Sequence, residues 1–421
     1  APSHVLPGAI EPSVTDNRTT RGWSRRLAGN IALAGAGLVA SLVVCELLLR
    51  LLGISYPVFV RTDPVRGVAH IPGVKSGWVE INSDGWRGPE VALKPPAGTL
   101  RIALLGDSYI EAFEVPFEKT AGQVLEHRLS ALRGAPVEVL NFGEGGYGTG
   151  QELLTLQHEV WKYSPDLVLL AFTPSNDVSD NYRPLKRTDY VPYFVYRGDT
   201  LVLDSSFLRS KGYQGRTLGT RHLLDIVQHS RLAQLVNRVR HLSRKGERQQ
   251  RNAAGSAGDE GEGPGDEMGL NDEVLLPPPT PDWKEAWRVT AGLLRVMHAD
   301  CRKHHTPFAI VTLTRGVQVT PVAEQKEKFL RHLGAKDLYY PERRLAEFGK
   351  AESIPVLNLA PPMAQQAEER HVYLHAHQGV SGVGHWNEEG NRVAGELIAS
   401  WLGGRLADSS GTGPTPDLTA R

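Results

Sequence analysis

One short segment constrains the fold of this chain more than any other. Ile102–Leu105 is continuously apolar and ends abruptly at Gly106, Asp107 and Ser108. An apolar run of this length, bounded by turn residues, predicts a buried strand of a parallel sheet. A helical pattern follows, so Ser108 lies where a central strand passes into a loop and a helix. Open α/β sheets bind their ligands at that edge. The alternative interpretation is a turn that only connects the strand to the helix.

The same alternation of strand and helix patterns continues along the chain. Further strands are predicted at Val137–Leu140, Leu167–Phe172, Pro307–Leu313 and Ile354–Leu359, after a first strand at Arg101–Leu105. Helices are predicted at Thr120–Leu132, Gln151–Tyr163, Trp283–His304 and Arg343–Gly349. This alternation predicts a parallel sheet with helices on both faces.

Three later segments carry polar or glycine-rich motifs at strand ends or at a helix entry. They are Asn141–Thr149, with the pattern Asn-x-Gly-x-x-Gly, then Ser175–Asp177, and His385–Asn387 before the last amphipathic helix. Together with Gly-Asp-Ser, and in this order, they resemble the SGNH (GDSL) hydrolase family over about residues 98–402, apart from a central insertion. The resemblance implies a three-layer α/β/α, flavodoxin-like fold with a five-stranded parallel sheet.

The resemblance also implies roles for individual residues. Ser108 would be the nucleophile and His385 the general base. The oxyanion would be bound by the backbone N–H of Ser108, the backbone at Gly146 and the side-chain amide of Asn176, with Asp107 in a supporting role. Alternatively, the glycines only make the loop flexible and the asparagine only forms a turn.

The sequence departs from the family pattern at the third member of the triad. The family carries an acid two or three residues before the histidine, where this chain has Val383 and Gly382. We therefore expect a Ser108–His385 dyad in which a backbone carbonyl accepts from the histidine ring. An acid from elsewhere in the chain, or an inactive site, are the alternatives.

A second histidine cluster lies just upstream, at His371, His375 and His377. His-x-His can ligate a metal, but no carboxylate or cysteine has matching spacing. We therefore expect no metal site and no cofactor.

The N-terminal region predicts a membrane anchor. Leu27–Leu52 is almost wholly apolar and long enough to cross a bilayer as a helix. Residues 1–26 read as a disordered cytoplasmic tail, because arginines precede the apolar segment, at Arg18, Arg21, Arg25 and Arg26. Residues 53–421 are then expected outside the cytoplasm, periplasmic or extracellular. Glu46 and Arg50, four residues apart, are expected to pair.

The remaining regions divide by composition. Residues 53–98 predict a linker and a small β platform, with a hairpin turn at Asp84-Gly85. Residues 99–402 predict the hydrolase-like domain, interrupted by an insertion at 182–282. That insertion contains a hairpin, an amphipathic helix at His222–Arg244 and a disordered segment at 243–282. Residues 403–421 predict a second disordered tail.

Charge and cysteine content exclude other classes. The 47 basic and 47 acidic residues balance, which gives no electrostatic case for nucleic acid. Two cysteines, Cys45 and Cys301, exclude a disulfide framework. The sequence thus predicts a membrane-anchored serine ester hydrolase that acts through an acyl-enzyme on O-acyl esters of envelope polysaccharide or lipid. The alternatives are an O-acyltransferase acting on glycans, a binding module on a catalytically weakened SGNH scaffold, and an interaction protein acting through its disordered segment.

Overall fold

The computed structural model describes residues 17–240, 271–377 and 379–409. A five-stranded parallel sheet forms the centre of the larger of two compact units, which comprises Pro57–Asp225 and Gln249–Arg421. Its strands lie in the order β11-β10-β7-β5-β6, which is the flavodoxin-like order 2-1-3-4-5. The strands are β5 (Leu100–Gly106), β6 (Val137–Gly143), β7 (Leu167–Phe172), β10 (Phe308–Thr312) and β11 (Val356–Asn358). The predicted strands and fold class are confirmed.

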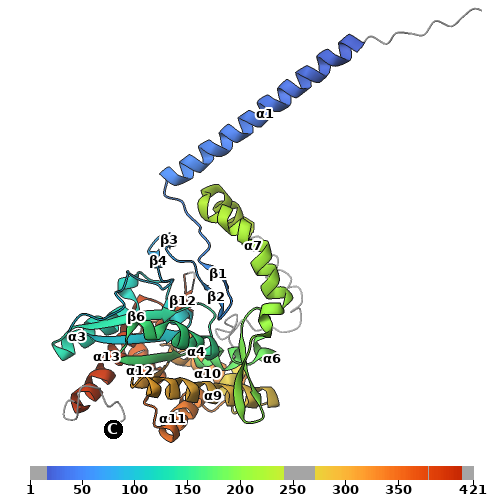
Figure 1. Cartoon of the computed structure of the whole chain (residues 1–421). Helices are drawn as coiled ribbons and strands as arrows, with labels where there is room; N and C mark the ends of the chain where they lie inside the picture. The colour runs from blue at the N-terminus through green and yellow to red at the C-terminus, as the bar shows by residue number, and fades with distance from the viewer. Residues whose placement is uncertain (1–16, 241–270, 378, 410–421) are drawn as a thin grey trace, which may run out of the picture. The chain divides into compact units, whose positions relative to one another are not determined.

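Helices cover both faces of this sheet (Figure 1). One face packs against α3 (Ala121–Arg133), α12 (Ala360–Arg370) and α13 (Glu388–Ser409). The other packs against α4 (Thr149–His158), α9 (Pro281–Lys303) and α11 (Tyr340–Glu352). Strand β5 contributes Ile102 and Leu104 to the first cluster and Ala103 and Leu105 to the second. Burial on both faces explains why the strand is continuously apolar and does not alternate.

Shorter elements connect this framework. They are α2 (Ser108–Glu111), α5 (Pro174–Asp180), α6 (Arg183–Lys186), α10 (Ala323–Leu333), and the 3₁₀ turns η1 (Phe117–Lys119), η2 (Val160–Tyr163), η3 (Ser206–Arg209), η4 (Asp272–Leu275) and η5 (Gly316–Val319). Two further antiparallel pairs lie outside the central sheet. The pair β8 (Tyr193–Arg197) with β9 (Thr200–Asp204) comes between β7 and β10 in the sequence, and the pair β12 (His375–His377) with β13 (Val380–Trp386) comes after β11. The first pair is the predicted hairpin of the insertion; α10, α12 and the second pair were not predicted.

Residues 57–98 form what we call the platform. It contains two short antiparallel pairs, β1 (Val60–Asp63) with β2 (Gly67–His70) and β3 (Lys75–Ser76) with β4 (Val79–Glu80). The predicted turn is present, because Ile81 bridges Arg87 and the intervening Gly85 has a φ of 87°. A left-handed φ of this kind favours glycine.

Three expected disordered ranges differ from the structure where it describes them. Helix α1 begins at Asn17, and α13 continues to Ser409. Within 243–282, residues 243–270 lie outside the described part, whereas 271–282 contain η4 and the start of α9. Val274 and Leu275 are fully buried in the core. The prediction of disorder is therefore wrong for that last stretch, because two apolar side chains in a polar context suffice to dock it.

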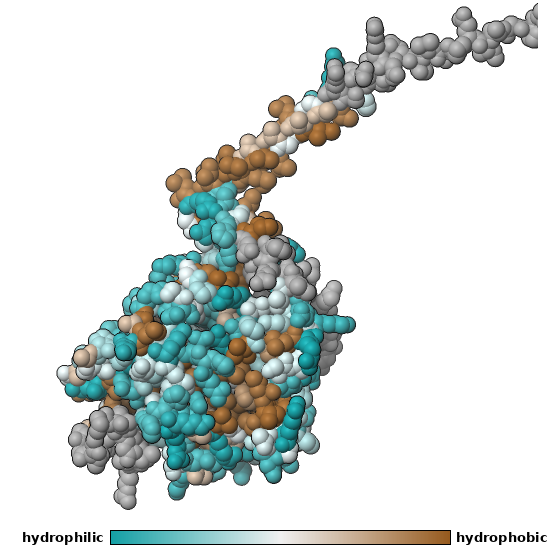
Figure 2. All heavy atoms as spheres, in the orientation of Figure 1, coloured by the Kyte–Doolittle hydropathy of each residue, from teal (hydrophilic) through white to brown (hydrophobic). Residues whose placement is uncertain are grey.

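The smaller unit comprises Ala1–Tyr56 and Ile226–Arg248. Its helix α1 (Asn17–Leu51) contains a stretch, Arg26–Leu51, that is long and apolar enough to cross a membrane, and none of its most apolar window is buried. Figure 2 shows the apolar side chains along this helix. These bounds agree with the predicted span.

The smaller unit also contains the charged pair near the end of α1. Arg50 contacts Glu46 at 2.7 Å, as predicted. The insertion, however, forms two helices where one was expected: α7 (Lys211–His229) ends and a helix at 231–240 begins. The Glu46 carboxylate accepts from Ser230 Oγ at 2.9 Å and from the backbone N–H groups of Arg231 and Leu232 at 3.0 and 2.9 Å. Glu46 therefore caps the second helix at its positive end.

We predict that Glu46→Ala loosens the start of helix 231–240. Loss of a helix cap costs about 0.5–2 kcal/mol, so the amides of Arg231 and Leu232 should exchange with solvent faster in the full chain in detergent. Glu46→Gln is the matched control, because its amide oxygen can still accept a hydrogen bond. Unchanged exchange in the alanine variant would show that the cap contributes nothing.

Candidate active site

Ser108 is the first residue of α2, directly after β5. The preceding Asp107 caps this short helix, since its buried carboxylate accepts from the Tyr109 N–H at 2.9 Å. Ser108 is half-buried, and its Oγ lies 2.7 Å from Nε2 of His385, although the two residues are 277 positions apart. That is the distance at which an imidazole can accept the proton of a hydroxyl nucleophile.

A second histidine holds the backbone beside His385. His375 is buried, with Nδ1 2.7 Å from the Gly384 carbonyl and Nε2 2.9 Å from the Thr314 hydroxyl. Burial lowers the pKa of His375 to about 4, so the ring is neutral at physiological pH and donates from Nδ1 to the carbonyl. Tyr109 packs edge-on against the His385 ring, with centroids 4.8 Å apart. His375 thus supports the backbone of β13 next to His385.

The acid that the sequence lacked near His385 is Glu114. Its Oε1 lies 2.9 Å from His385 Nδ1, on the side of the ring opposite Ser108. The expected dyad with a backbone carbonyl is therefore wrong in this structure. A carboxylate at Nδ1 selects the tautomer whose Nε2 can accept the serine proton, and it stabilises the imidazolium that forms. Glu114 comes from the loop after α2, not from the segment before the histidine.

An acid is disfavoured at position 382, three residues before the histidine. Gly382 has a φ of 84°, and a Cβ at this position would lie 3.0 Å from the Tyr373 ring. An aspartate would be strained there. The backbone conformation of β13 at Gly382 therefore disfavours an acid three residues before His385.

The two charges at His385 and Glu114 perturb each other. Burial opposes the charged form of His385, but the contact with Glu114 outweighs it and raises the pKa of the imidazole above its ordinary value. Burial likewise opposes ionisation of Glu114, and the contact with His385 brings the pKa of the carboxyl below its ordinary value. Both shifts favour the ion pair.

The other predicted site residues lie in the same region but not all in one contact network. Asn176, in α5, donates from Nδ2 to the Asp107 carboxylate at 2.9 Å, so Asp107 links this amide to the start of α2. Burial raises the pKa of Asp107. Gly146 is exposed with a φ of 78°, and its carbonyl accepts from Lys186 Nζ at 2.8 Å. Oxyanion binding by Ser108, Gly146 and Asn176 stays a prediction.

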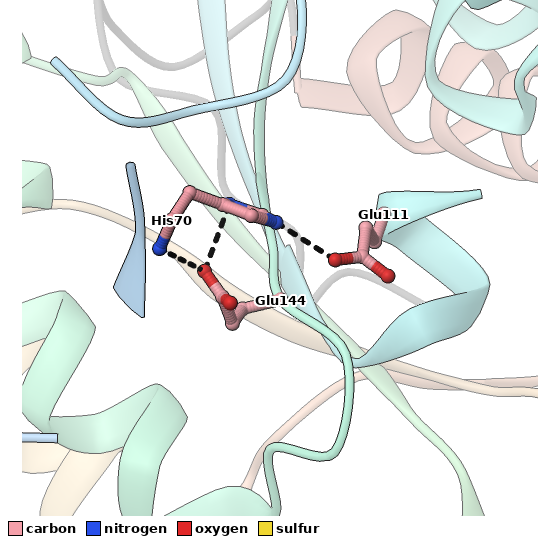
Figure 3. A group of neighbouring side chains, drawn as sticks. All are labelled: His70, Glu111 and Glu144. Atoms are coloured by element: carbon pink, nitrogen blue, oxygen red, sulfur yellow. Dashed lines mark hydrogen bonds and ion pairs between the residues drawn. The ribbon is translucent and has the colours of Figure 1, made fainter. Parts of the chain in front are cut away.

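One group in the described part of the chain has the residue types of a metal site: His70, Glu111 and Glu144, with ligand atoms within 4.8 Å of one another. Figure 3 shows the His70 ring between the two carboxylates. Its Nε2 lies 2.7 Å from Glu111 and its Nδ1 2.8 Å from Glu144. These are hydrogen-bond distances, which leave no space for an ion between the partners. The two carboxylates raise the pKa of His70 to about 9 against the effect of burial. The group is a buried salt bridge, and the sequence pattern did not indicate it.

Comparisons with known proteins find solved structures of low similarity to this chain. No protein-family model matches the sequence, and no curated protein matches it. Among solved structures, the chain is similar to a lipase/acylhydrolase from Enterococcus faecalis (14% identity, 73% of this chain and 96% of that chain, TM-score 0.33). It is also similar to a GDSL-like lipase from Bacteroides thetaiotaomicron (12%, 71% and 86%, 0.28) and to the acetyl xylan esterase AlAXEase (11%, 72% and 98%, 0.36). Because all of these TM-scores are below 0.5, the description of the fold rests on the observed strand order alone.

We predict that Glu114→Gln alters the pH dependence of the site as well as its rate. The titratable groups around His385 are Glu114, Asp107, Glu111 and His375. Removing the closest anion lowers the pKa of His385, so the acidic limb of kcat/KM should move to lower pH. The plateau should fall by up to about 10⁴-fold, the loss expected when the wrong tautomer is populated.

Glu118→Gln serves as the control, because it removes the same charge from an exposed position in η1. A limb that does not move in Glu114→Gln would contradict the role of this carboxylate.

Proposed function

We propose that the chain is a serine ester hydrolase that acts through an acyl-enzyme. The observation that carries this proposal is the relay from Ser108 Oγ to His385 Nε2 and from His385 Nδ1 to Glu114. A binding module would need no such relay, and random surface contacts would not align three groups in order. The relay therefore favours a catalytic domain over a weakened scaffold.

The reaction follows from the proton positions. Ser108 Oγ attacks the acyl carbonyl carbon while its proton passes to His385 Nε2, and Glu114 stabilises the resulting imidazolium. The carbonyl electron pair moves onto the oxygen, where N–H donors from Ser108, Gly146 and Asn176 would bind it. The imidazolium then protonates the departing alcohol. Water then attacks the acyl carbon while His385 takes its proton. The bond to Ser108 Oγ breaks, the carboxylic acid is released, and His385 returns the proton to Ser108 Oγ.

The substrate class is an O-acyl ester of carbohydrate or lipid. Ser108 and His385 are only half-buried and Gly146 is exposed, so a bulky alcohol portion can remain in solvent while its acyl group reaches the serine. Transfer to a sugar hydroxyl would use the same acyl-enzyme and differ only in the acceptor of the second step.

We predict that Ser108→Ala abolishes ester hydrolysis without unfolding the protein. A series of p-nitrophenyl esters of increasing acyl length, with and without an added glycan acceptor, measures hydrolysis and transfer together. Fluorophosphonate labelling should be lost in the same variant. Ser205→Ala, at an exposed position before η3, is the control. Turnover at the wild-type rate in Ser108→Ala would exclude Ser108 as the nucleophile.

We further propose that α1 crosses the membrane with its N-terminus in the cytoplasm. The apolar stretch of α1 and the arginines before it support this orientation. The hydrolase domain would then act outside the cytoplasm, on envelope esters.

A reporter at the C-terminus tests this topology. We predict that a fluorescent protein that matures only in the cytoplasm stays dark there, whereas alkaline phosphatase at the same position is active. The opposite pair of results would place the domain in the cytoplasm.

A further inference from the structure

The loop that carries Glu114 has no regular structure of its own. It runs from Ala112 to Val115, between α2 and η1, and about a third of the Glu114 side chain is exposed. Ala112 has a φ of 49°, a left-handed conformation that a non-glycine residue adopts only when its surroundings hold it. An orienting carboxylate must be held to a fraction of an ångström, so this loop needs support from elsewhere.

Arg87 of the platform supplies that support. Its side chain is 2% exposed. Nη1 donates to the Glu111 carbonyl at 2.6 Å and to the Ala112 carbonyl, and Nη2 donates to the Val115 carbonyl at 2.5 Å. These carbonyls lie on both sides of Glu114. Only the planar fork of an arginine offers several donors in such a fixed arrangement.

Three further platform residues hold the same loop. Trp78 Nε1 donates to the Phe113 carbonyl at 3.1 Å, and the Phe59 and Phe113 rings pack 5.1 Å apart. His70, in β2, contacts the Glu111 carboxylate at the end of α2, where the loop begins (Figure 3). The carbonyls of residues 111, 112, 113 and 115 are thus all bonded by platform side chains.

We propose that Arg87 is a positioning residue for the reaction, which acts by holding the Glu114 loop so that the carboxylate meets His385. The inference rests on the proposed function. It makes the platform part of the catalytic machinery and not only a linker from α1. It also accounts for an acid on a loop remote from the histidine motif.

The test uses the direction of the change in the His385 pKa. Besides Glu114, the titratable groups around His385 are Asp107, Glu111 and His375. Arg87 is a cation whose own charge acts on Glu111 and Glu114. Loss of that charge alone would raise the pKa of His385, whereas displacement of Glu114 would lower it. The sign therefore separates positioning from a simple charge effect.

The experiment measures the His385 imidazole titration by NMR in the full chain, assigned with His385→Gln, together with kcat/KM against pH. Arg87→Lys keeps the charge and loses the fork, and Arg87→Met loses both. We expect both variants to lower the pKa of His385 and to reduce kcat about 10²-fold with little change in KM. In a Glu114→Gln background, Arg87→Lys should add almost no further loss, because its effect passes through Glu114.

Two controls keep the result interpretable. Arg101→Met removes another buried arginine, one that donates to the Leu93 and Tyr163 carbonyls in the core, and should lower stability without moving the pKa of His385. Trp78→Phe removes one donor to the loop from a side chain that is 58% exposed. Trp78→Phe should also lower the pKa of His385. It therefore serves as the test if the Arg87 variants do not fold.

An unchanged or raised pKa of His385 in the folded Arg87 and Trp78 variants would overturn the proposal, as would rate losses that multiply with Glu114→Gln. A different result would contradict the proposed function: wild-type protein that hydrolyses no ester and in which fluorophosphonate does not label Ser108. The NMR titration still tests the positioning role in that case, because it needs no turnover.

Discussion

The contact between His385 and Glu114 is the interaction on which the site depends. It places a carboxylate on the ring nitrogen that faces away from Ser108, and it favours the charged form of the imidazole. Without it, Ser108 and His385 would be two polar residues at a sheet edge. Glu114 also extends the site beyond the four motifs, because the loop around it is bonded to the platform through Arg87 and Trp78.

Three histidines show how burial and neighbouring charge assign different tasks to the same side chain. His70 lies between two carboxylates, which raise its pKa to about 9 and keep it a cation. His375 is buried against a carbonyl and a hydroxyl, and its pKa of about 4 keeps it neutral. His385 faces one carboxylate and one hydroxyl, and the carboxylate of Glu114 raises its pKa against the effect of burial. The cation joins the end of α2 to the segment after β6, the neutral ring supports a backbone carbonyl, and the third faces the Ser108 hydroxyl.

Much of the fold follows from the sequence because it is written in local patterns. The apolar run at Ile102–Leu105 and its counterparts mark buried strands, and the helical spacing between them predicts the parallel sheet. The helix Arg26–Leu51 is evident from length and hydropathy alone. Elements with weaker patterns, such as α10 and the β12–β13 pair, were missed because packing against the rest of the domain stabilises them more than their own sequence does.

The sequence by itself determined the sheet, the apolar N-terminal helix, and the placement of Ser108, Asn176 and His385 at strand ends or a helix entry. Only the tertiary structure decided which acid completes the relay. Glu114 follows Ser108 by six residues. Because α2 ends at Glu111, neither helical nor strand periodicity predicts where the Glu114 side chain lies relative to Ser108. The position of the Glu114 side chain depends on the left-handed backbone of Ala112 and on Arg87, which comes from a separate segment of the chain. Hydrogen bonds between residues far apart in the chain produce no periodic sequence pattern, because each one joins a single pair of positions.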